Sequence, residues 1–201
     1  MQIQSLDNTV SELERLLKSE RPVKITGEGD LVHAAVMMIL SESPDGLSML
    51  FIKRPESEID AFSGHMAFPG GKMKEGDENK LATAMRETLE EIGIDLYTSG
   101  RVIGELDDVN PNNPRASNFI VTPYISLLEE EVPLRLNLLE VEAAVWVPMK
   151  HLTDGRFFKV RFRERNGILV EDYVYSFERY VIWGMTGRIL HRFLSFSAHL
   201  F

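Results

Sequence analysis

Residues 68–94 read FPGGKMKEGDENKLATAMRETLEEIGI, and this stretch divides into a loop and a helix. Residues 69–77 contain one proline and three glycines, so the chain there can turn tightly and bring bare backbone close to a ligand. Residues 78–92 contain neither glycine nor proline and are rich in Leu, Ala, Met and Glu, which predicts a helix. Gly93 is typical of a helix end.

The predicted helix sorts its side chains into two faces. One face follows the i, i+3, i+4, i+7 spacing and should pack against a core; it comprises Leu81, Ala84, Met85, Thr88, Leu89 and Ile92. Glu87, Glu90 and Glu91 share an arc of about 100°, roughly opposite the apolar face.

The three glutamates need an explanation, because like charges so close together repel one another and raise each other's pKa. A bare Glu-x-x-Glu-Glu is usually a solvated acidic face. Here, however, the carboxylates directly follow a loop that can aim backbone carbonyls. That arrangement is suited to holding a hard divalent cation such as Mg²⁺ against phosphate oxygens.

The same residues resemble a known family. Gly71 is followed after five residues by Asp77, and the run 86–94 reads RETLEEIGI. This pattern is similar to the Nudix box of hydrolases that cleave nucleoside diphosphates linked to another group. The chain departs from the usual box in three places: Asp77 replaces Glu, eight residues instead of seven separate it from Arg86, and Thr88 takes an apolar position.

The resemblance implies an α/β protein with the Nudix fold, an α/β/α sandwich around a mixed β-sheet. It also implies hydrolysis of a diphosphate bond by water that Mg²⁺ or Mn²⁺ activates. The expected metal ligands are Glu87, Glu90, Glu91 and the carbonyl of Gly70. Glu87 is either a ligand or the base, Arg86 orients the carboxylates, and Glu140 is a further candidate for base or ligand. Arg54 and Gly71 are expected to contact the substrate.

Beyond the box, the chain is similar to the coenzyme A pyrophosphatase branch of the family over roughly residues 31–195. The landmarks are LFIKR at 50–54, FPGG at 68–71, Glu140-Val141 before Trp146-Val147-Pro148, and YVIWGMT at 180–186. That branch implies a coenzyme A-like substrate.

The loop before the box favours other substrates. Pro55 stands where the branch has Ser, and residues 55–65 contain no Arg or Lys but carry Glu56, Glu58 and Asp60. If the loop lines the pocket, these acids disfavour an extra phosphate, and coenzyme A should react no faster than dephospho-coenzyme A. An NDP-sugar, ADP-ribose or another nucleoside diphosphate derivative stays open as substrate. A nucleotide-sensing module of the same fold that cleaves nothing also stays open.

Length and composition agree with a single enzyme domain over residues 1–201, with residues 1–24 as an N-terminal helical extension. The net charge of −9 argues against general nucleic-acid binding but not against a small phosphorylated nucleotide whose charge a metal screens. The absence of cysteine excludes disulfides and thiol catalysis. We expect no signal peptide or membrane span, and a cytoplasmic location.

The remaining chain predicts alternating strands and helices, and hence a layered α/β fold. The N-terminal helix, 6–19, packs either on the domain or on a second copy of the chain in a homodimer. We expect strands at 31–40, 48–54, 99–106, 117–128 and 137–149, with Pro123 suggesting an edge or a break. A hairpin is predicted from 157–163 and 168–177 around Asn166-Gly167, and a closing helix at 181–196.

Overall fold

The computed structural model describes residues 2–27, 30–57, 63–111, 116–165 and 168–201. Its helices are α1 (Gln2–Ser19), α2 (Lys80–Ile92), α3 (Leu96–Ser99), α4 (Met149–Leu152) and α5 (Gly184–Ser197), with 3-10 turns at Gly155–Phe157 and Ala198–Leu200. Its strands are β1 (Val32–Ser43), β2 (Gly46–Lys53), β3 (Met66–Ala67), β4 (Gly70–Lys72), β5 (Gly100–Glu105), β6 (Phe119–Leu128), β7 (Ala143–Pro148), β8 (Phe158–Arg165), β9 (Ile168–Phe177) and β10 (Tyr180–Ile182).

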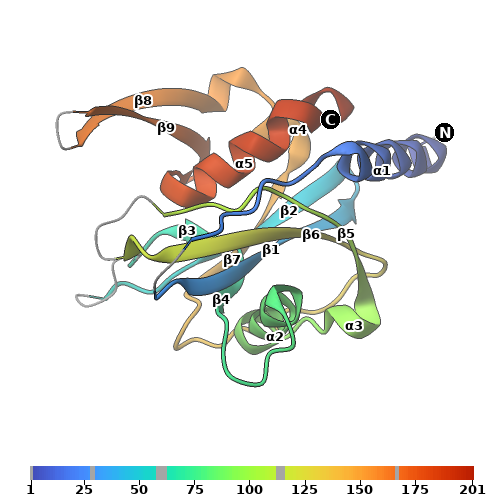
Figure 1. The fold of residues 1–201 in the computed structure, drawn as a ribbon. Coiled ribbons are helices and arrows are strands. Elements are labelled where there is room, and N and C mark those ends of the chain that lie inside the picture. The colour runs from blue at the N-terminus through green and yellow to red at the C-terminus, as the bar shows by residue number, and fades with distance from the viewer. Residues whose placement is uncertain (1, 28–29, 58–62, 112–115, 166–167) are drawn as a thin grey trace.

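A mixed sheet forms the middle layer. Its main path runs β3-β2-β1-β6-β5, with β4 paired to β1 and β7 paired to β2. The β1–β6 pair is parallel and the other pairs of this sheet are antiparallel. Helices α1 and α5 cover one face of the sheet, and α2 and α3 cover the other (Figure 1). The predicted α/β/α sandwich is therefore confirmed.

Strand β1 lies at the centre because both of its faces are apolar. Ala34, Val36 and Met38 face the α1 and α5 side, whereas Ala35 and Met37 face the α2 side. Alternate residues of a strand point to opposite faces, so a continuous apolar run is what a doubly covered strand requires. The prediction of a buried strand at 31–40 is thus confirmed.

Pro123 does not mark an edge of the sheet, but the ladder between β5 and β6 breaks off next to it. Strand β6 is paired on both sides, with β1 and with β5. The missing N–H of Pro123 does little harm on the β5 side, because that ladder ends at Glu105 opposite Tyr124. Beyond it, the Pro123 carbonyl accepts a hydrogen bond from the Leu106 amide at 2.9 Å. A proline can therefore occupy a central strand where a ladder stops.

Helix α1 packs on its own domain. Val10, Leu13 and Leu17 are buried in the same core cluster as α5. The helix end is also tied to the domain, because Arg192 of α5 forms ion pairs with both Glu20 and Asp107. Of the two locations that the sequence left open for this helix, the structure shows the first.

The C-terminal part follows the prediction with one change. Strands β8 and β9 form the expected antiparallel hairpin, which projects from the body in Figure 1; its turn, Asn166-Gly167, lies outside the described residues. The predicted helix at 181–196 begins instead at Gly184, because residues 180–182 pair with β9 as strand β10. Among the described residues, none of the helices is both long and apolar enough to cross a membrane.

Candidate metal centre and substrate cavity

Helix α2 ends at the residue that the sequence indicates but begins at Lys80, two residues after the predicted start at residue 78. The Asn79 side chain accepts a hydrogen bond from the Ala82 amide at 2.9 Å and caps the first turn. Gly93 ends the helix in the left-handed conformation, with φ of 75°, and donates its N–H to the Leu89 carbonyl. The helix is therefore fixed at both ends, which holds its glutamates in place.

Arg86 fastens the glycine loop to α2. It donates two hydrogen bonds to Asp77, at 2.8 and 2.9 Å, and one to the Lys72 carbonyl at 3.1 Å. These bonds, together with those from the Lys74 amide and the Thr83 hydroxyl, hold the pKa of Asp77 far below its ordinary value. Asp77, one of the departures from the usual box, thus joins the glycine loop to α2 through Arg86.

Three carboxylates converge beside this loop. Glu87, Glu91 and Glu140 each offer an oxygen within 4.8 Å of the other two. Glu87 and Glu91 come from α2, whereas Glu140 comes from the segment that precedes β7. The Gly70 amide donates a hydrogen bond to Glu91 at 2.9 Å, so the loop backbone also contacts the group.

Glu91, whose spacing places it roughly opposite the apolar face of α2, is nevertheless buried, with only 1% of it exposed. The segment before β7 lies across the end of α2, where the Arg135 amide bonds to the Ile92 carbonyl and the Asn137 amide to the Glu91 carbonyl. Helix α2 is therefore covered on two sides. Leu89, expected in the core, is instead 49% exposed.

Burial changes the chemistry of Glu91. The pKa of Glu91 is raised to about 8, chiefly by desolvation and also by the nearby charges of Glu87 and Glu140, while the hydrogen bond from Gly70 and the charge of Arg54 act in the opposite direction. Arg86 and Lys74 lie near Glu87, at 2.7 and 3.6 Å, but neither is paired with Glu91. Within the part of the chain that the structure describes, no ion pair within 4 Å involves Glu91.

Glu90 does not join this group of carboxylates. Its side chain is partly exposed and accepts hydrogen bonds from Lys74 at 3.2 Å and from Arg86 at 3.0 Å. The i to i+4 contact between Arg86 and Glu90 is the one that the sequence suggested. The structure therefore brings Glu87 and Glu91 together with Glu140 and leaves Glu90 beside them.

Gly70 and Gly71 connect the carboxylates to a cavity of 470 Å³. Both glycines line this cavity, and the Glu87 carboxylate lies so close to Gly71 that an added Cβ would stand 2.6 Å from its Cδ. At Gly70, where φ is 153°, a Cβ would stand 2.3 Å from the Ala35 carbonyl oxygen. Glycine is therefore required at Gly70 for the loop to meet strand β1, whereas a side chain at Gly71 would displace the Glu87 carboxylate.

Cations and aromatic rings line the same cavity. Arg54, at the end of β2, and Lys72, on β4, both contribute to its wall. The wall also contains His65 and Trp183, whose ring centroids lie 4.7 Å apart. The carboxylates thus lie next to the glycines, and Arg54 and Lys72 place positive charge on the wall of the cavity.

Sequence reasoning assigned Arg54 and Gly71 to the substrate but missed Lys72, His65 and Trp183. Trp183 belongs to the YVIWGMT landmark, which signalled family likeness without indicating a role. His65 lies in the loop before the box, and the residue that its ring contacts, Trp183, is more than a hundred residues away in sequence. Only the tertiary fold brings these residues to one cavity.

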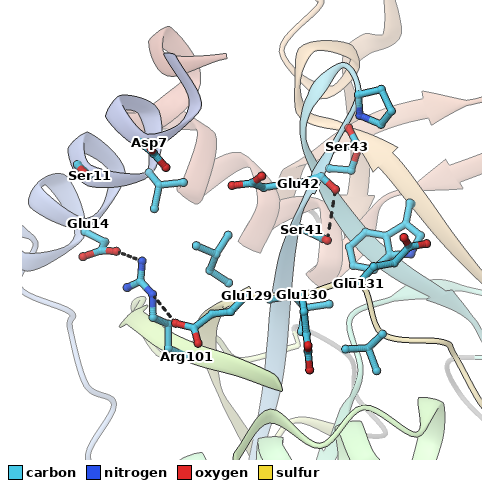
Figure 2. Close-up of a pocket in the computed structure, with 17 residues that line it drawn as sticks. Asp7, Ser11, Glu14, Ser41, Glu42, Ser43, Arg101, Glu129, Glu130 and Glu131 are labelled. Atoms are coloured by element: carbon cyan, nitrogen blue, oxygen red, sulfur yellow. Dashed lines mark hydrogen bonds and ion pairs between the residues drawn. The ribbon is translucent and has the colours of Figure 1, made fainter. Parts of the chain in front are cut away.

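A larger cavity of 1080 Å³ lies elsewhere, between α1, the end of β1 and the chain after β6. Figure 2 shows Arg101 between Glu14 and Glu129, with Asp7, Glu42, Glu130 and Glu131 around it. Arg101 is the one Lys or Arg among the described lining residues. Since an acidic lining repels a diphosphate, we do not assign the substrate to this cavity.

Comparison with known proteins places this site in context. Residues 31–166 match the NUDIX domain. NudL of Photorhabdus laumondii, described as an uncharacterized Nudix hydrolase, is 29% identical over 160 residues, which cover 80% of this chain and 82% of that protein.

Two solved structures carry the same fold. The crystal structure of a MutT/nudix family protein from Enterococcus faecalis has a TM-score of 0.55 at 18% identity and covers 92% of this chain and 68% of its own. The NUDIX domain of Shewanella oneidensis NrtR, solved with ADP ribose, has a TM-score of 0.50 at 16% identity. The match covers 69% of this chain and 84% of the NrtR chain.

Proposed function

The chain belongs to the Nudix hydrolase family, and from this premise we propose that Glu87, Glu91 and Glu140 hold a divalent metal ion for hydrolysis of a diphosphate bond in a nucleoside diphosphate derivative. The observation that carries the proposal is the convergence of three carboxylates, with oxygens within 4.8 Å of one another, behind the two glycines that line a cation-lined cavity. A coenzyme A-like compound is the first candidate substrate.

The residues present fit a hard divalent ion. The donors are carboxylate oxygens, which Mg²⁺ and Mn²⁺ prefer over softer metals. Burial and like charge raise the pKa of Glu91, and a bound cation would relieve both effects. Glu87 and Glu91 are the proposed ligands from α2, and the Gly70 carbonyl and Glu90 stay candidate ligands.

A bound metal ion would lower the pKa of the attacking water and would neutralise charge on the phosphate oxygens. The side chains around the site position the metal ligands and the substrate. Arg86 holds the loop and Glu87 in register through its bonds to Asp77, the Lys72 carbonyl and Glu87. Arg54 and Lys72, which line the cavity, would bind the phosphates that face away from the carboxylates.

The base that accepts the proton of the attacking water is Glu87 or Glu140. Glu87 is buried and accepts a hydrogen bond from Arg86, which fixes the position of its carboxylate and suits a metal ligand. Glu140 is exposed and receives a hydrogen bond from the Asn137 side chain at 3.0 Å. Because Glu140 comes from outside α2, it can face a reacting water from another side than the α2 carboxylates.

ADP-ribose and NDP-sugars are the second candidate substrates, since they share the diphosphate and the nucleoside. ADP ribose is also the ligand named for the NrtR structure. A binding module that cleaves nothing is the competing class. The convergence of three carboxylates speaks against it, because a pure binder has less need of a metal-binding set at its cavity.

The test is a panel of coenzyme A, dephospho-coenzyme A, ADP-ribose and an NDP-sugar, each assayed for product release with Mg²⁺, with Mn²⁺ and with a chelator. We expect hydrolysis of at least one compound, dependent on the metal and abolished by the chelator. Binding without product release would favour the sensing module. Metal-independent hydrolysis would contradict the proposed site.

A further inference from the structure

Trp183, the N-cap residue of α5, lines the same cavity as Gly70 and Gly71, whereas Arg161 and Arg163 are not among the lining residues. Two guanidinium groups lie over its ring, with Cζ of Arg161 at 5.1 Å and Cζ of Arg163 at 5.4 Å from the centroid. Both arginines come from β8, where positions two apart share a face. Positive charge therefore lies one aromatic ring away from the cavity.

Asp172 fixes this pair of arginines from the neighbouring strand. It stands opposite Arg161 in the β8–β9 register, and only 3% of its side chain is exposed. Arg163 donates Nη2 to Oδ1 at 3.0 Å and also pairs through Nε with Oδ2. Arg161 donates Nη2 to Oδ2 at 3.1 Å.

The two arginines differ in what the fold needs from them. Arg163 engages both oxygens of Asp172 and so neutralises the buried carboxylate without help. Arg161 makes one bond to the same carboxylate, and 47% of its side chain is exposed. Two guanidinium groups on one carboxylate leave one positive charge in excess, with the remaining donors of Arg161 directed to no acceptor among the described residues.

A guanidinium held by a carboxylate and an aromatic ring is prepared to bind a phosphate, because little side-chain freedom remains to be lost. The diphosphate of the proposed substrate would lie at the glycine end of the cavity, so a second anionic group would be met at the Trp183 end. The acids Glu58 and Asp60, which favoured exclusion of such a group, lie outside the described residues.

We propose that Arg161, positioned by Asp172 and Trp183, binds a phosphomonoester that the substrate carries in addition to its scissile diphosphate. Arg163 serves to position Arg161 and the buried carboxylate. The inference rests on the proposed function and narrows its substrate to compounds with an extra phosphomonoester. It is the reverse of the expectation from the loop acids that coenzyme A reacts no faster than dephospho-coenzyme A.

The test compares kcat/KM for coenzyme A and dephospho-coenzyme A, which differ by one phosphomonoester, in wild type and in Arg161→Gln. Wild type should prefer coenzyme A by about tenfold or more, the usual range for one charge-assisted bond. Arg161→Gln should bring the ratio near one by raising KM for coenzyme A, with kcat on the dephospho form unchanged. The variant should fold, because Arg163 still pairs with Asp172.

Arg156→Gln is the matched control. Arg156 also pairs with a carboxylate, Asp154, and lies over a ring, Phe157, but this ring does not line the cavity, whereas the Trp183 ring under Arg161 does. It should keep the wild-type ratio. The inference is overturned if Arg161→Gln also keeps that ratio, or if wild type shows no preference for coenzyme A.

Calorimetry separates this inference from the proposed function. Wild type should bind adenosine 3′,5′-bisphosphate at least about tenfold more tightly than AMP, and Arg161→Gln should lose the difference. If that holds while no compound is hydrolysed, the proposed function fails and the phosphate site stands. Hydrolysis without any dependence on Arg161 refutes the phosphate site alone.

Discussion

At the scale of single residues, the departures from the usual box have physical explanations. Asp77 comes one residue early and is shorter than Glu, yet it accepts two bonds from Arg86. Thr88 replaces an apolar residue but is fully buried, and its hydroxyl donates to the Ala84 carbonyl at 2.7 Å. Neither departure disturbs the positions of Glu87 and Glu91.

Asp77→Asn should lower the free energy of unfolding by about 1–2 kcal/mol at pH 7, because it removes charge-assisted bonds to Arg86. The folded protein depresses the pKa of Asp77, so this contribution is complete above its unfolded pKa of about 3.9 and is lost as the pH falls toward the folded value. Urea unfolding should therefore show a gap between wild type and variant that narrows from pH 7 to pH 3. A gap of constant size would contradict this role.

Gly71→Ala should weaken metal binding while leaving the fold stable. The new Cβ would stand 2.6 Å from the Glu87 Cδ, and a flexible carboxylate can move away at little cost to stability. The displaced carboxylate should raise the Mg²⁺ concentration for half-maximal turnover by roughly tenfold. Gly155→Ala, where nothing lies within 4 Å of the added Cβ, should behave as wild type. An unchanged Mg²⁺ dependence in Gly71→Ala would remove Glu87 from the metal site.

At the scale of elements, α1 is part of the domain core. Leu13→Ala should lower the free energy of unfolding by about 2–5 kcal/mol, since Leu13 is fully buried in the cluster that α1 shares with α5. Ser11→Ala, on the exposed side of the same helix, should change little. Chemical denaturation measures both. A loss below about 1 kcal/mol for Leu13→Ala would mean that α1 is only loosely attached.

Local sequence signals predicted most long elements of the fold. The continuous apolar run predicted β1, the alternating segments around Asn166-Gly167 predicted β8 and β9, and composition with Gly93 predicted α2 and its end. The short strands β3, β4 and β10 were missed, because two or three residues carry no periodicity. Their existence depends on distant partners, such as β1 for β4.

The candidate site was predictable only in part, for a similar reason. The box placed Glu87 and Glu91 on one helix, and a family landmark suggested Glu140. The burial of Glu91 could not be predicted, because it depends on the segment before β7 that crosses α2. The arginines that lie over Trp183 come from β8, about a hundred residues after the loop in which the sequence pattern placed the phosphate contacts.

At the scale of the whole molecule, the fold separates charge across one cavity. The carboxylates of Glu87, Glu91 and Glu140 lie beside Gly70 and Gly71, Arg54 and Lys72 place positive charge on the cavity wall, and the C-terminal part of the chain adds Trp183, over which Arg161 lies. The net charge of the chain is −9, and we propose that the cations lining the cavity let an anionic substrate approach. On the proposed assignment, hydrolysis and substrate choice belong to different parts of the sequence.

The central claim is that hydrolysis takes place at the Glu87, Glu91 and Glu140 carboxylates. The most direct measurement is the turnover of Glu91→Gln at saturating Mg²⁺, on the compound that wild type hydrolyses fastest. Gln keeps the size of Glu and can still accept the Gly70 hydrogen bond, so the fold should survive while a charged ligand is lost. We predict a fall of at least about a hundredfold, since even partners of ligands account for 10–100-fold, with Glu78→Gln as an exposed control at wild-type turnover. Wild-type turnover in Glu91→Gln would contradict the account.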